Sequence, residues 1–568
     1  MAATQSRIWW NVPVTMRDGA PLATDIYFPA AGPDGGPYPA VLTRTPYDKQ
    51  NPGAHYGPYL SDRGFVVVAQ DVRGRHGSDG PWVPFRHEGP DGCDTVEWVA
   101  RQPWCTGRVG TFGGSYGGWY QWALARERPP HLTTMVSTAS CGAWMEEIPY
   151  HNGCVMLVML GWLALTGGRT MQNPALTTDW PEVFRHLPLR TMDRRLGRDL
   201  PTWREWLDHP TLDDYWRALR LDDDFARIDV PTLHITGWFD DDQPGALFMF
   251  DGMRARSPRA AEQHLVIGPW DHAGTRTPRQ VLGGVDFGAG ALTDIRDLHR
   301  RWFDRWLRDA ADAGDAEAMP AARLFVTGVN AWRDSAAWPP PGVEVRPLYL
   351  RSEGRANTLA GDGRLDDVAA AADEPADTYT YDPENPVPGV LDENFYSPDA
   401  VETPLDLRFQ HRRDDVLVYT GAAAQTPTVI AGYPVVHLYG SSDAPDTDWF
   451  ADLHDVAPSG ASMILAQGQM RARFRDSLEH EVLMQSGKVY AFRLRLSAVG
   501  HVVRPGHRLR LTVTSSRFPT FDRNPNTGHP IGQDAELRVA TNRIHHDGAH
   551  ASRLELPVAP ADLLGRDG

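Results

Sequence analysis

Residues 108–125 read RVGTFGGSYGGWYQWALA, and this stretch decides the fold. Its first five residues have the composition of a short buried strand, and its last seven predict a helix. Between them, the pattern G-x-S-x-G places Ser115 in a tight turn between Gly113 and Gly117. Small residues there let the strand and the helix approach closely, while the turn forces the serine backbone into a strained conformation. This is the setting of a nucleophilic serine; the alternative is a glycine turn with an incidental serine.

Two later strand-like runs end beside the partners that such a serine needs. A serine hydroxyl requires a base to remove its proton, and the base requires an acid to orient it. Residues 230–237 predict a buried strand followed by the acids 240–242, and residues 264–268 predict the next strand, followed by His272. The chain order is therefore serine, acid, histidine. All three follow strand ends, where the catalytic groups of open α/β sheets lie.

Length and charge bound the class of protein. A chain of 568 residues is too long for one core, so we expect about two to four domains. The net charge of −17 argues against binding to nucleic acid. Residues 1–10 lack the apolar core of a signal peptide, and the most apolar stretch, residues 154–165, is too short to cross a bilayer. We expect a cytoplasmic protein that does not associate with a membrane.

The four cysteines, at positions 93, 105, 141 and 154, form neither a dense disulfide framework nor a C-x-x-C metal site. We interpret them as mostly buried thiols, and a pairing of 93 with 105 or of 141 with 154 stays open. The sequence contains no H-E-x-x-H or comparable metal-ligand spacing, and no phosphate-binding glycine loop followed by lysine. It therefore predicts no metal site.

The secondary-structure pattern divides the chain into three parts. Strand-like and helix-like runs alternate over residues 1–143 and again over residues 229–345, which predicts a mostly parallel sheet. Residues 144–228 have helical spacing and interrupt that sheet between the serine and the acid, so we expect a helical cap there. Residues 346–568 contain many short β-like runs separated by turns, which is typical of a β-sandwich or jelly roll.

Short motifs spread in order over nearly the whole chain resemble the cocaine esterase family. Relatives of that family include X-prolyl dipeptidyl aminopeptidases, α-amino acid ester hydrolases and glutaryl-cephalosporin acylases. The matching motifs are RTPY (44–47), DVRG (71–74), GGSYGG (113–118), GWFD (237–240), GPWDH (268–272), SDAPDTDW (442–449) and GHRL (506–509). The resemblance implies an α/β-hydrolase core with an inserted helical cap, a C-terminal jelly-roll β-domain and no cofactor.

Carried over position by position, the resemblance implies that Ser115 is the nucleophile, Asp240 the acid and His272 the base. It also implies an oxyanion hole formed by the backbone N–H of Tyr116 and the phenol of Tyr47. A side-chain donor is consistent with the sequence, because no His-Gly-Gly-Gly segment supplies a second backbone donor. The alternative interpretation of Tyr47 is a half-buried loop tyrosine.

Other acids lie close to the predicted pair. Motif position favours Asp240 as the acid, and we interpret Asp241 and Asp242 as solvated loop carboxylates, although Asp242 could face the substrate pocket. Asp271 directly precedes His272, but adjacency in sequence does not give a hydrogen bond to the imidazole. We therefore interpret Asp271 as structural.

The sequence says least about the substrate. The α-amino acid ester hydrolases hold a substrate ammonium with carboxylates, one of them three residues after the nucleophile, where this chain has Gly118. We interpret the cap acids at 146–147 and 213–214 as solvated. A desolvated ammonium needs anionic partners, so we expect an apolar acyl site instead. Trp144 and Trp162 are candidates to contact an aromatic acyl group, with core packing as the alternative for each.

These observations predict a serine hydrolase that cleaves small-molecule acyl esters or amides through an acyl-enzyme intermediate. One alternative is an acyltransferase that uses the same intermediate, and another is an α-amino acid ester hydrolase or a dipeptidyl peptidase-like enzyme. The alternative from another class is a non-catalytic binding protein, and the intact order of serine, acid and histidine argues against it. Nothing in the sequence excludes a homo-oligomer.

Overall fold

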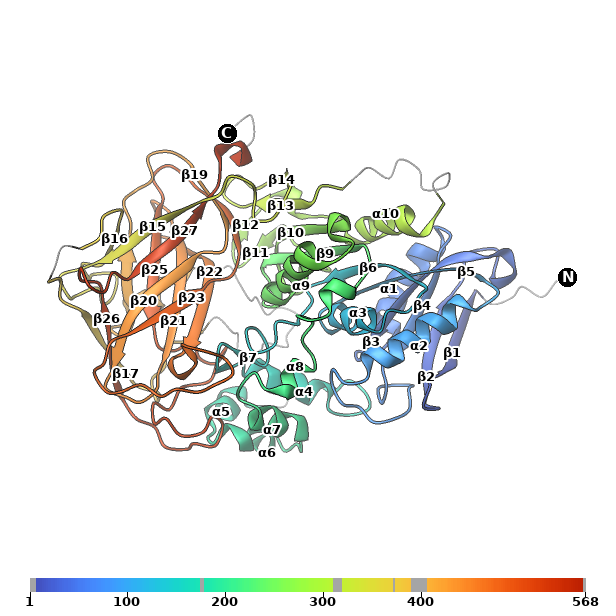
Figure 1. Cartoon of the computed structure of the whole chain (residues 1–568), viewed down its shortest axis with the longest axis horizontal. Helices are drawn as coiled ribbons and strands as arrows, with labels where there is room; N and C mark the ends of the chain where they lie inside the picture. The colour runs from blue at the N-terminus through green and yellow to red at the C-terminus, as the bar shows by residue number, and fades with distance from the viewer. Residues whose placement is uncertain (1–6, 174–177, 310–318, 371–372, 390–405, 565–568) are drawn as a thin grey trace.

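The computed structural model describes residues 7–173, 178–309, 319–370, 373–389 and 406–564. They form an α/β core, a helical cap and an all-β domain (Figure 1). The core and the all-β domain lie side by side, and the cap lies below them in this view. The cap is inserted into the core, and the all-β domain follows both along the chain.

The core is built on a mixed sheet with the strand order β1-β2-β4-β3-β5-β6-β9-β10-β13-β14. Neighbouring strands from β4 to β13 run parallel, whereas β1, β2 and β14 are antiparallel to their neighbours. The strands are β1 Ile8–Thr15, β2 Pro21–Tyr27, β3 Tyr38–Thr45, β4 Val66–Asp71, β5 Cys105–Gly114, β6 Leu132–Thr138, β9 Thr232–Phe239, β10 Gln263–Asp271, β13 Ala322–Val326 and β14 Ala331–Ser335.

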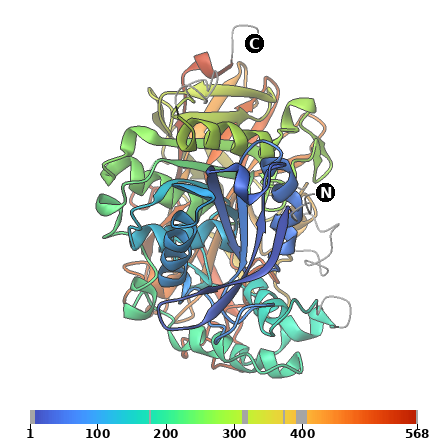
Figure 2. The same cartoon turned by 90° about the vertical axis from the view of Figure 1, so that its right-hand side faces the viewer.

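Helices cover both faces of this sheet because its parallel strands are apolar on both sides. In β3, Val41 packs into the cluster beneath α1 and α10, whereas its neighbour Leu42 packs into the cluster beneath α2, α3 and α9. Figure 2 looks at the molecule from the β1–β2 edge and shows helices on either side of the sheet. The helices are α1 Gln50–Ser61, α2 Glu88–Ala100, α3 Tyr116–Arg126, α9 Gln243–Arg256 and α10 Ile295–Leu307.

The parallel strands bring the predicted site residues to one edge of the sheet. Tyr47 follows β3, Ser115 follows β5, Asp240 follows β9 and His272 follows β10. These are the carboxyl ends of parallel strands, which meet at the same edge. Segments far apart in the sequence therefore converge there.

The cap connects β6 to β9 and is mainly helical, as predicted. Its helices are α4 Val158–Thr166, α5 Trp180–Arg185, α6 Met192–Arg195, α7 Pro201–Asp208 and α8 Asp214–Arg217. A small hairpin of β7 (Tyr150–His151) and β8 (Cys154–Val155) precedes them and was not predicted. Trp203, Trp206 and Trp216 are buried inside the cap, so part of the high tryptophan content serves packing.

The all-β domain contains one sheet that curls around its own hydrophobic core. Its main strand order is β17-β26-β20-β27-β15-β16-β18-β25-β21-β22, with β19, β23 and β24 paired beside this path. The strands are β15 Glu344–Arg351, β16 Arg364–Asp366, β17 Asp377–Tyr381, β18 Leu417–Thr420, β19 Thr428–Gly432, β20 Val435–Ser442, β21 Asp448–Val456, β22 Ser462–Arg471, β23 Tyr490–Arg495, β24 Val499–Val503, β25 Arg508–Thr514, β26 Ala540–His545 and β27 Arg553–Val558. A further hairpin, β11 Val281–Leu282 and β12 Val285–Asp286, lies in the core.

A buried ion network joins the all-β domain to the cap. The guanidinium of Arg471 donates to Asp448 (Nε to Oδ1, 2.9 Å) and to Asp522 (Nη2 to Oδ1, 2.8 Å). Asp522 Oδ1 also accepts the backbone N–H of Val155 in the cap hairpin (2.8 Å). Charge-assisted bonds of this kind hold the hairpin, and the residues that follow it, in one position against the all-β domain.

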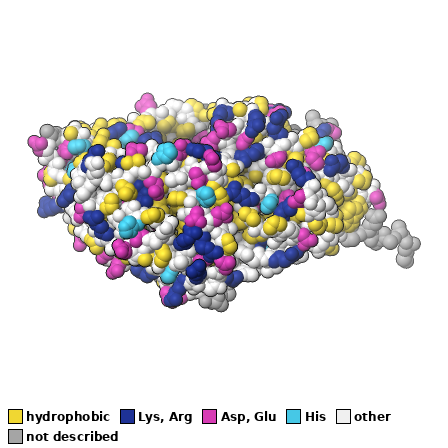
Figure 3. Space-filling model, turned by 60° about the horizontal axis from the view of Figure 1, so that its bottom comes forward, with side chains coloured by type: hydrophobic (Ala, Val, Ile, Leu, Met, Phe, Trp, Pro, Cys, Tyr) yellow, Lys and Arg dark blue, Asp and Glu magenta, His cyan; other side chains and the backbone are white. Residues whose placement is uncertain are grey.

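Several sequence expectations concern the surface and the boundaries. All four cysteines are free thiols, buried except for the partly exposed Cys93. None of the described helices is long and apolar enough to span a membrane. Acidic and basic side chains are interspersed over the face drawn in Figure 3. The predicted boundaries after residues 143, 228 and 345 stay predictions; the core sheet ends at Ser335, and β15 begins at Glu344.

Candidate active site

Ser115 lies in a strained turn between β5 and α3. Its backbone has φ 62° and ψ −127°, a region that residues with a side chain rarely occupy. The turn is fixed on both sides: Ser115 N–H donates to Thr138 O (3.0 Å), and Ser115 O accepts from Gly118 N (2.7 Å) and Trp119 N (3.0 Å). The hydroxyl is thereby presented at the end of the strand, as the sequence pattern predicts for a nucleophile.

The two glycines of the motif differ in how strictly the geometry requires them. A Cβ atom on Gly113 would lie 2.4 Å from the carbonyl oxygen of Gly117, so β5 and α3 are in backbone contact there. A Cβ atom on Gly117 would have Arg44 O at 3.7 Å as its nearest neighbour, which is ordinary contact. Gly113 therefore permits the close approach, while the space at Gly117 would accept an alanine.

His272 and Asp240 meet at the same edge of the sheet. Their side chains form a hydrogen bond between Nδ1 and Oδ1 of 2.8 Å, and the Asp240 carboxylate also accepts from Thr236 Oγ1 (2.8 Å). Burial alone would raise the pKa of Asp240, but the hydrogen bond and the charge of His272 outweigh it and hold the pKa below its ordinary value. Asp271 instead accepts the N–H of Gly274 (2.7 Å), which fits the predicted structural role.

The neighbouring acids are closer to His272 than the sequence indicated. Asp241 Oδ1 lies 3.2 Å and Asp242 Oδ2 lies 3.8 Å from His272 Nδ1. The Asp241 side chain is 39% exposed, whereas that of Asp242 is 10% exposed, so describing Asp242 as a solvated carboxylate was wrong. Burial, with the charges of Asp241 and Glu147, raises the pKa of Asp242 well above its ordinary value. Asp242 does face the cavity, as the alternative allowed.

Tyr47 presents its phenol to the cavity through a bond with the cap. Trp162 Nε1 of α4 donates to the Tyr47 hydroxyl oxygen at 2.8 Å. Burial raises the pKa of Tyr47 to about 12, and hydrogen bonds with Trp162 and Ser115 lower it by less. The phenol therefore keeps its proton near neutral pH. Because Trp162 occupies a lone pair of the oxygen, the O–H can be directed toward Ser115.

The loop that carries Tyr47 is anchored by charged residues that sequence reasoning did not single out. Asp71 at the end of β4 accepts both the backbone N–H (2.8 Å) and the Nζ (2.9 Å) of Lys49. Arg75 donates to Pro46 O (2.9 Å) and to Thr166 O of α4 (2.7 Å). Asp71 belongs to the DVRG motif noted above, so that motif was the available signal. These bonds tie the Tyr47 loop to both the sheet and the cap.

The backbone N–H and the phenol of Tyr116 lie in different surroundings. It is the first residue of α3, so its backbone N–H has no acceptor within the helix and lies beside Ser115. Its phenol is turned away into the core, where it donates to Glu88 and accepts the N–H of Phe85 (3.2 Å). The backbone N–H, and not the phenol, is therefore the group that can serve as an oxyanion donor.

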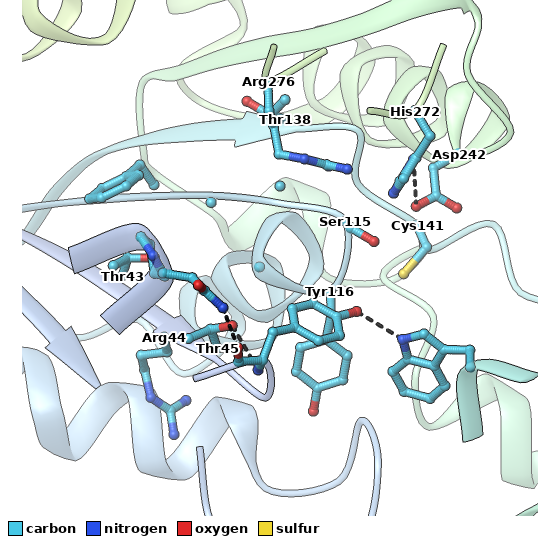
Figure 4. Close-up of a pocket in the computed structure, with 18 of the residues that line it drawn as sticks. Thr43, Arg44, Thr45, Ser115, Tyr116, Thr138, Cys141, Asp242, His272 and Arg276 are labelled. Carbon is cyan, nitrogen blue, oxygen red and sulfur yellow. Dashed lines mark hydrogen bonds and ion pairs between the residues drawn. The ribbon is translucent and has the colours of Figure 1, made fainter. Parts of the chain in front are cut away.

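These residues surround a cavity of about 650 Å³ (Figure 4). Ser115, His272, Asp242 and Arg276 face the same space in that view. We call one side the apolar wall, formed mainly by cap residues, and the other the polar wall, formed by α1, α10 and the loop after β10. The apolar wall comprises Phe85, Ile148, Met156, Met159, Trp162 and Leu165, and the polar wall comprises Asn51, His55, Tyr56, Arg276, Thr277 and His299.

Trp162 lies at the cavity, whereas Trp144 lies in the hydrophobic core. Trp162 lines the cavity and stacks near Phe85, with ring centroids 5.6 Å apart. Trp144 is fully buried, stacks on Trp216 (5.6 Å) inside the cap and is not among the residues that line the cavity. The structure therefore gives no support to a substrate contact for Trp144, and core packing accounts for it.

The other candidate acids lie outside the cavity or are occupied. A Cβ atom on Gly118 would lie 2.7 Å from Thr138 O, so this position has no room for a carboxylate. Glu146 pairs with Arg220 (3.0 Å), and Asp213 caps α8. Glu147 is buried, so its interpretation as a solvated acid was wrong. Its Oε2 accepts the N–H groups of Gly142 (2.9 Å) and Ala143 (3.0 Å).

Among the described residues, Asp240, Asp241 and His272 form the group whose ligand atoms lie close enough together to hold a metal ion, within 4.8 Å of one another. The nitrogen concerned is the one that hydrogen-bonds Asp240. A metal on Nδ1 would displace the proton of that bond, so metal binding and the His272–Asp240 pair are alternatives for the same atoms.

Two family models match the chain. Residues 18–274 match X-Pro dipeptidyl-peptidase (S15 family), and residues 315–555 match the X-Pro dipeptidyl-peptidase C-terminal non-catalytic domain. The chain is 35% identical to the cocaine esterase of Rhodococcus sp. (strain MB1 Bresler), over 96% of this chain and 98% of that protein.

Solved structures show the same architecture. An α-amino acid ester hydrolase, 28% identical, superposes with a TM-score of 0.87 over 98% of both chains. An aminopeptidase from a marine sediment Thaumarchaeota archaeon, 26% identical, superposes with a TM-score of 0.88 over 99% of this chain and 98% of the other. Together with the family matches, these structures confirm the predicted resemblance and the α/β-hydrolase core with its cap and C-terminal jelly-roll domain.

The glycine geometry predicts unequal effects of two alanine substitutions. Gly113→Ala places a methyl group 2.4 Å from a backbone oxygen, so we expect the free energy of unfolding to fall by about 1–3 kcal/mol. Gly117→Ala meets only ordinary contacts and replaces a glycine inside a helix, so we expect the free energy of unfolding to stay unchanged or to rise by up to about 1 kcal/mol. Denaturant unfolding of both variants measures this. Equal losses would show that the close approach of β5 and α3 is not what requires Gly113.

The buried Glu147 predicts a pH-dependent stability difference. Burial, with the charges of Asp240 and Asp241, raises the Glu147 pKa to about 8 in the folded chain, whereas in the unfolded chain it ionises near 4.5. Between these values only the unfolded chain is ionised, so the wild type loses stability as pH rises. Glu147→Gln keeps an acceptor for both N–H groups and lacks this titration.

We therefore expect the stability of Glu147→Gln relative to the wild type to increase from pH 5 to pH 8 by at least about 1 kcal/mol. Calorimetric unfolding of both proteins across this range measures the difference. A difference that stays constant with pH, or that favours the wild type at pH 8, contradicts the raised pKa.

Proposed function

Because this chain belongs to the X-Pro dipeptidyl-peptidase (S15) family of serine hydrolases, we propose that Ser115, His272 and Asp240 form its catalytic triad, cleaving acyl ester or amide bonds. The observation that carries the assignment is the convergence of a strained serine and a hydrogen-bonded His272–Asp240 pair at one sheet edge. Both groups line or border the same cavity.

The proposed reaction proceeds through an acyl-enzyme. Ser115 Oγ attacks the substrate carbonyl while His272 removes its proton, and Asp240 holds the imidazole in the required tautomer. The Tyr47 phenol and the Tyr116 N–H donate to the oxygen that becomes negative in the tetrahedral intermediate. His272 then protonates the leaving alcohol or amine, and water cleaves the acyl-enzyme by the same steps. Nothing in the cavity favours transfer to another acceptor over hydrolysis.

For the acyl group we propose a largely apolar group that carries no ammonium. The apolar wall supplies Phe85, Met159 and Trp162, and the rings of Phe85 and Trp162 stack with centroids 5.6 Å apart, a surface suited to an aromatic or aliphatic group. The absence of space at Gly118 removes one carboxylate that would hold an ammonium. Burial and the charges of neighbouring acids raise the pKa of Asp242, which disfavours the ionised form that an ammonium would need as its partner.

The setting of the enzyme is also a proposal. We propose a small-molecule substrate, no nucleic-acid partner and a cytoplasmic location. These rest on the net charge of −17 and on the free thiols. A homo-oligomer stays a prediction that size measurements in solution can decide.

The triad assignment predicts the behaviour of Ser115→Ala. This variant lacks the attacking oxygen, so we expect ester turnover to fall by several orders of magnitude and labelling by a serine-directed fluorophosphonate to disappear. The unfolding temperature should stay close to that of the wild type. Labelling at another serine, or turnover that persists in the variant, would refute the assignment.

The Trp162–Tyr47 bond predicts that the two residues act together on the reaction. Tyr47→Phe removes an oxyanion donor, so we expect kcat to fall about 10²–10³-fold with little change in KM. Trp162→Phe removes the N–H that orients the phenol, so we expect a loss of about fivefold.

In the Tyr47→Phe background, Trp162→Phe should lower kcat by less than about twofold, because the group it orients is already absent. The double-mutant cycle of kcat values measures this coupling. Independent, multiplicative losses would mean that Trp162 contacts the substrate directly instead of acting through Tyr47.

A further inference from the structure

The cavity contains an arginine, Arg276, that forms no direct ion pair with any described carboxylate. Arg276 lines the cavity, and Figure 4 shows its side chain extending across it toward Ser115 and His272. Its Nη1 atom is buried from solvent and has no hydrogen-bond partner. Within the described part of the chain no carboxylate forms an ion pair with it, and the charges of Asp241 and Asp242 interact with it only at longer range.

Two other arginines of this protein show how buried guanidinium groups pair with acids. Arg73 donates to Asp91 (Nε to Oδ2, 3.0 Å), and the Arg473 Nε donates to Asp446 (2.8 Å). The Arg276 side chain as a whole is partly exposed, but its Nη1 atom has lost contact with water and gained no compensating bond. A ligand anion in the cavity would supply that bond, which makes Arg276 a recognition group rather than a structural one.

Gly114 creates the space in which Arg276 lies. A Cβ atom on Gly114 would come within 2.8 Å of both the Cδ and the Nη1 of Arg276. Gly114 immediately precedes Ser115 and is the last residue of β5. The guanidinium of Arg276 therefore lies beside the end of the strand that carries the proposed nucleophile. One substrate molecule can therefore place its carbonyl at Ser115 and an anionic group at Arg276.

The residues around Arg276 are suited to an anion. His299 lines the cavity with both ring nitrogens buried and without partners, and it stacks on Tyr56 with centroids 5.2 Å apart. Burial lowers the pKa of His299 to about 3, so it is neutral and offers one N–H donor. Thr277 and Asn51 add further polar groups to this wall. A planar guanidinium with neutral donors beside it matches a carboxylate.

We propose that Arg276 binds a carboxylate on the substrate, so that the enzyme prefers esters or amides with an anionic group near the scissile bond. The carboxylate can belong to the acyl group or to the leaving group, and the chemistry at Arg276 is the same. This proposal rests on the proposed function of Ser115, because it concerns the substrate of that same site.

The test compares isosteric substrates that differ in one charge. For the leaving group, the pair is the phenylacetate ester of 3-hydroxybenzoate against that of 3-hydroxybenzamide. For the acyl group, it is the monophenyl ester of adipic acid against the phenyl ester of its monoamide. We expect the carboxylate member of at least one pair to have a kcat/KM about 10- to 100-fold higher in the wild type. The pair that shows the preference identifies whether the bound carboxylate belongs to the acyl group or to the leaving group.

Substitutions then assign the preference to Arg276. In Arg276→Gln, the ratio of kcat/KM for the carboxylate substrate to kcat/KM for the amide substrate should fall below about threefold. Arg276→Lys should retain part of this preference, because lysine keeps the positive charge but not the planar fork of the guanidinium. Arg279→Gln, in the same loop and not lining the cavity, should keep the wild-type ratio.

Three outcomes would overturn the proposal. The wild type could show no carboxylate preference in either pair, the preference could survive in Arg276→Gln, or Arg276→Gln could lower kcat/KM for both members of a pair by the same factor. Failure of the proposed function is distinguishable from these. In that case the wild type would hydrolyse none of the four esters, or Ser115→Ala would hydrolyse them equally well.

Discussion

The site depends on the close approach of β5 and α3. Because no side chain fits between Gly113 and the backbone of Gly117, the chain turns within one residue, and Ser115 takes up the strained φ of 62°. The same turn puts the first N–H of α3 beside the serine and leaves room at Gly114 for Arg276. A single steric constraint thus positions the proposed nucleophile, one proposed oxyanion donor and the proposed anion-binding group.

The remaining groups are brought in by separate loops, and each loop is held by charged residues. The Lys49–Asp71 pair and the Arg75 bonds fix the Tyr47 loop against the sheet and the cap, and the Arg471 network fixes the cap hairpin against the all-β domain. An oxyanion donor on a loop is useful only if it does not move during the reaction, since preorganised dipoles are what stabilise the developing charge. The non-catalytic parts therefore support the chemistry by restricting motion.

The sequence was sufficient where function follows local pattern. Ser115, Asp240 and His272 each come directly after a strand, so their convergence could be inferred from strand order. Contacts across inserted segments could not. The Trp162–Tyr47 bond joins residues 115 positions apart, and the burial of Trp144 and Glu147 depends on how the cap folds on itself. Arg276 was also missed, because a loop arginine looks solvated until the cavity around it is known.

The most direct test of this account is the structure of the protein after reaction with an aryl phosphonate, whose tetrahedral phosphorus stands in for the intermediate. The account predicts phosphorus bonded to Ser115 Oγ, with one phosphonyl oxygen about 2.7–3.1 Å from both the Tyr47 hydroxyl and the Tyr116 N. His272 Nδ1 would stay hydrogen-bonded to Asp240. A phosphonyl oxygen that points away from Tyr47, with another donor in its place, would contradict the central claim.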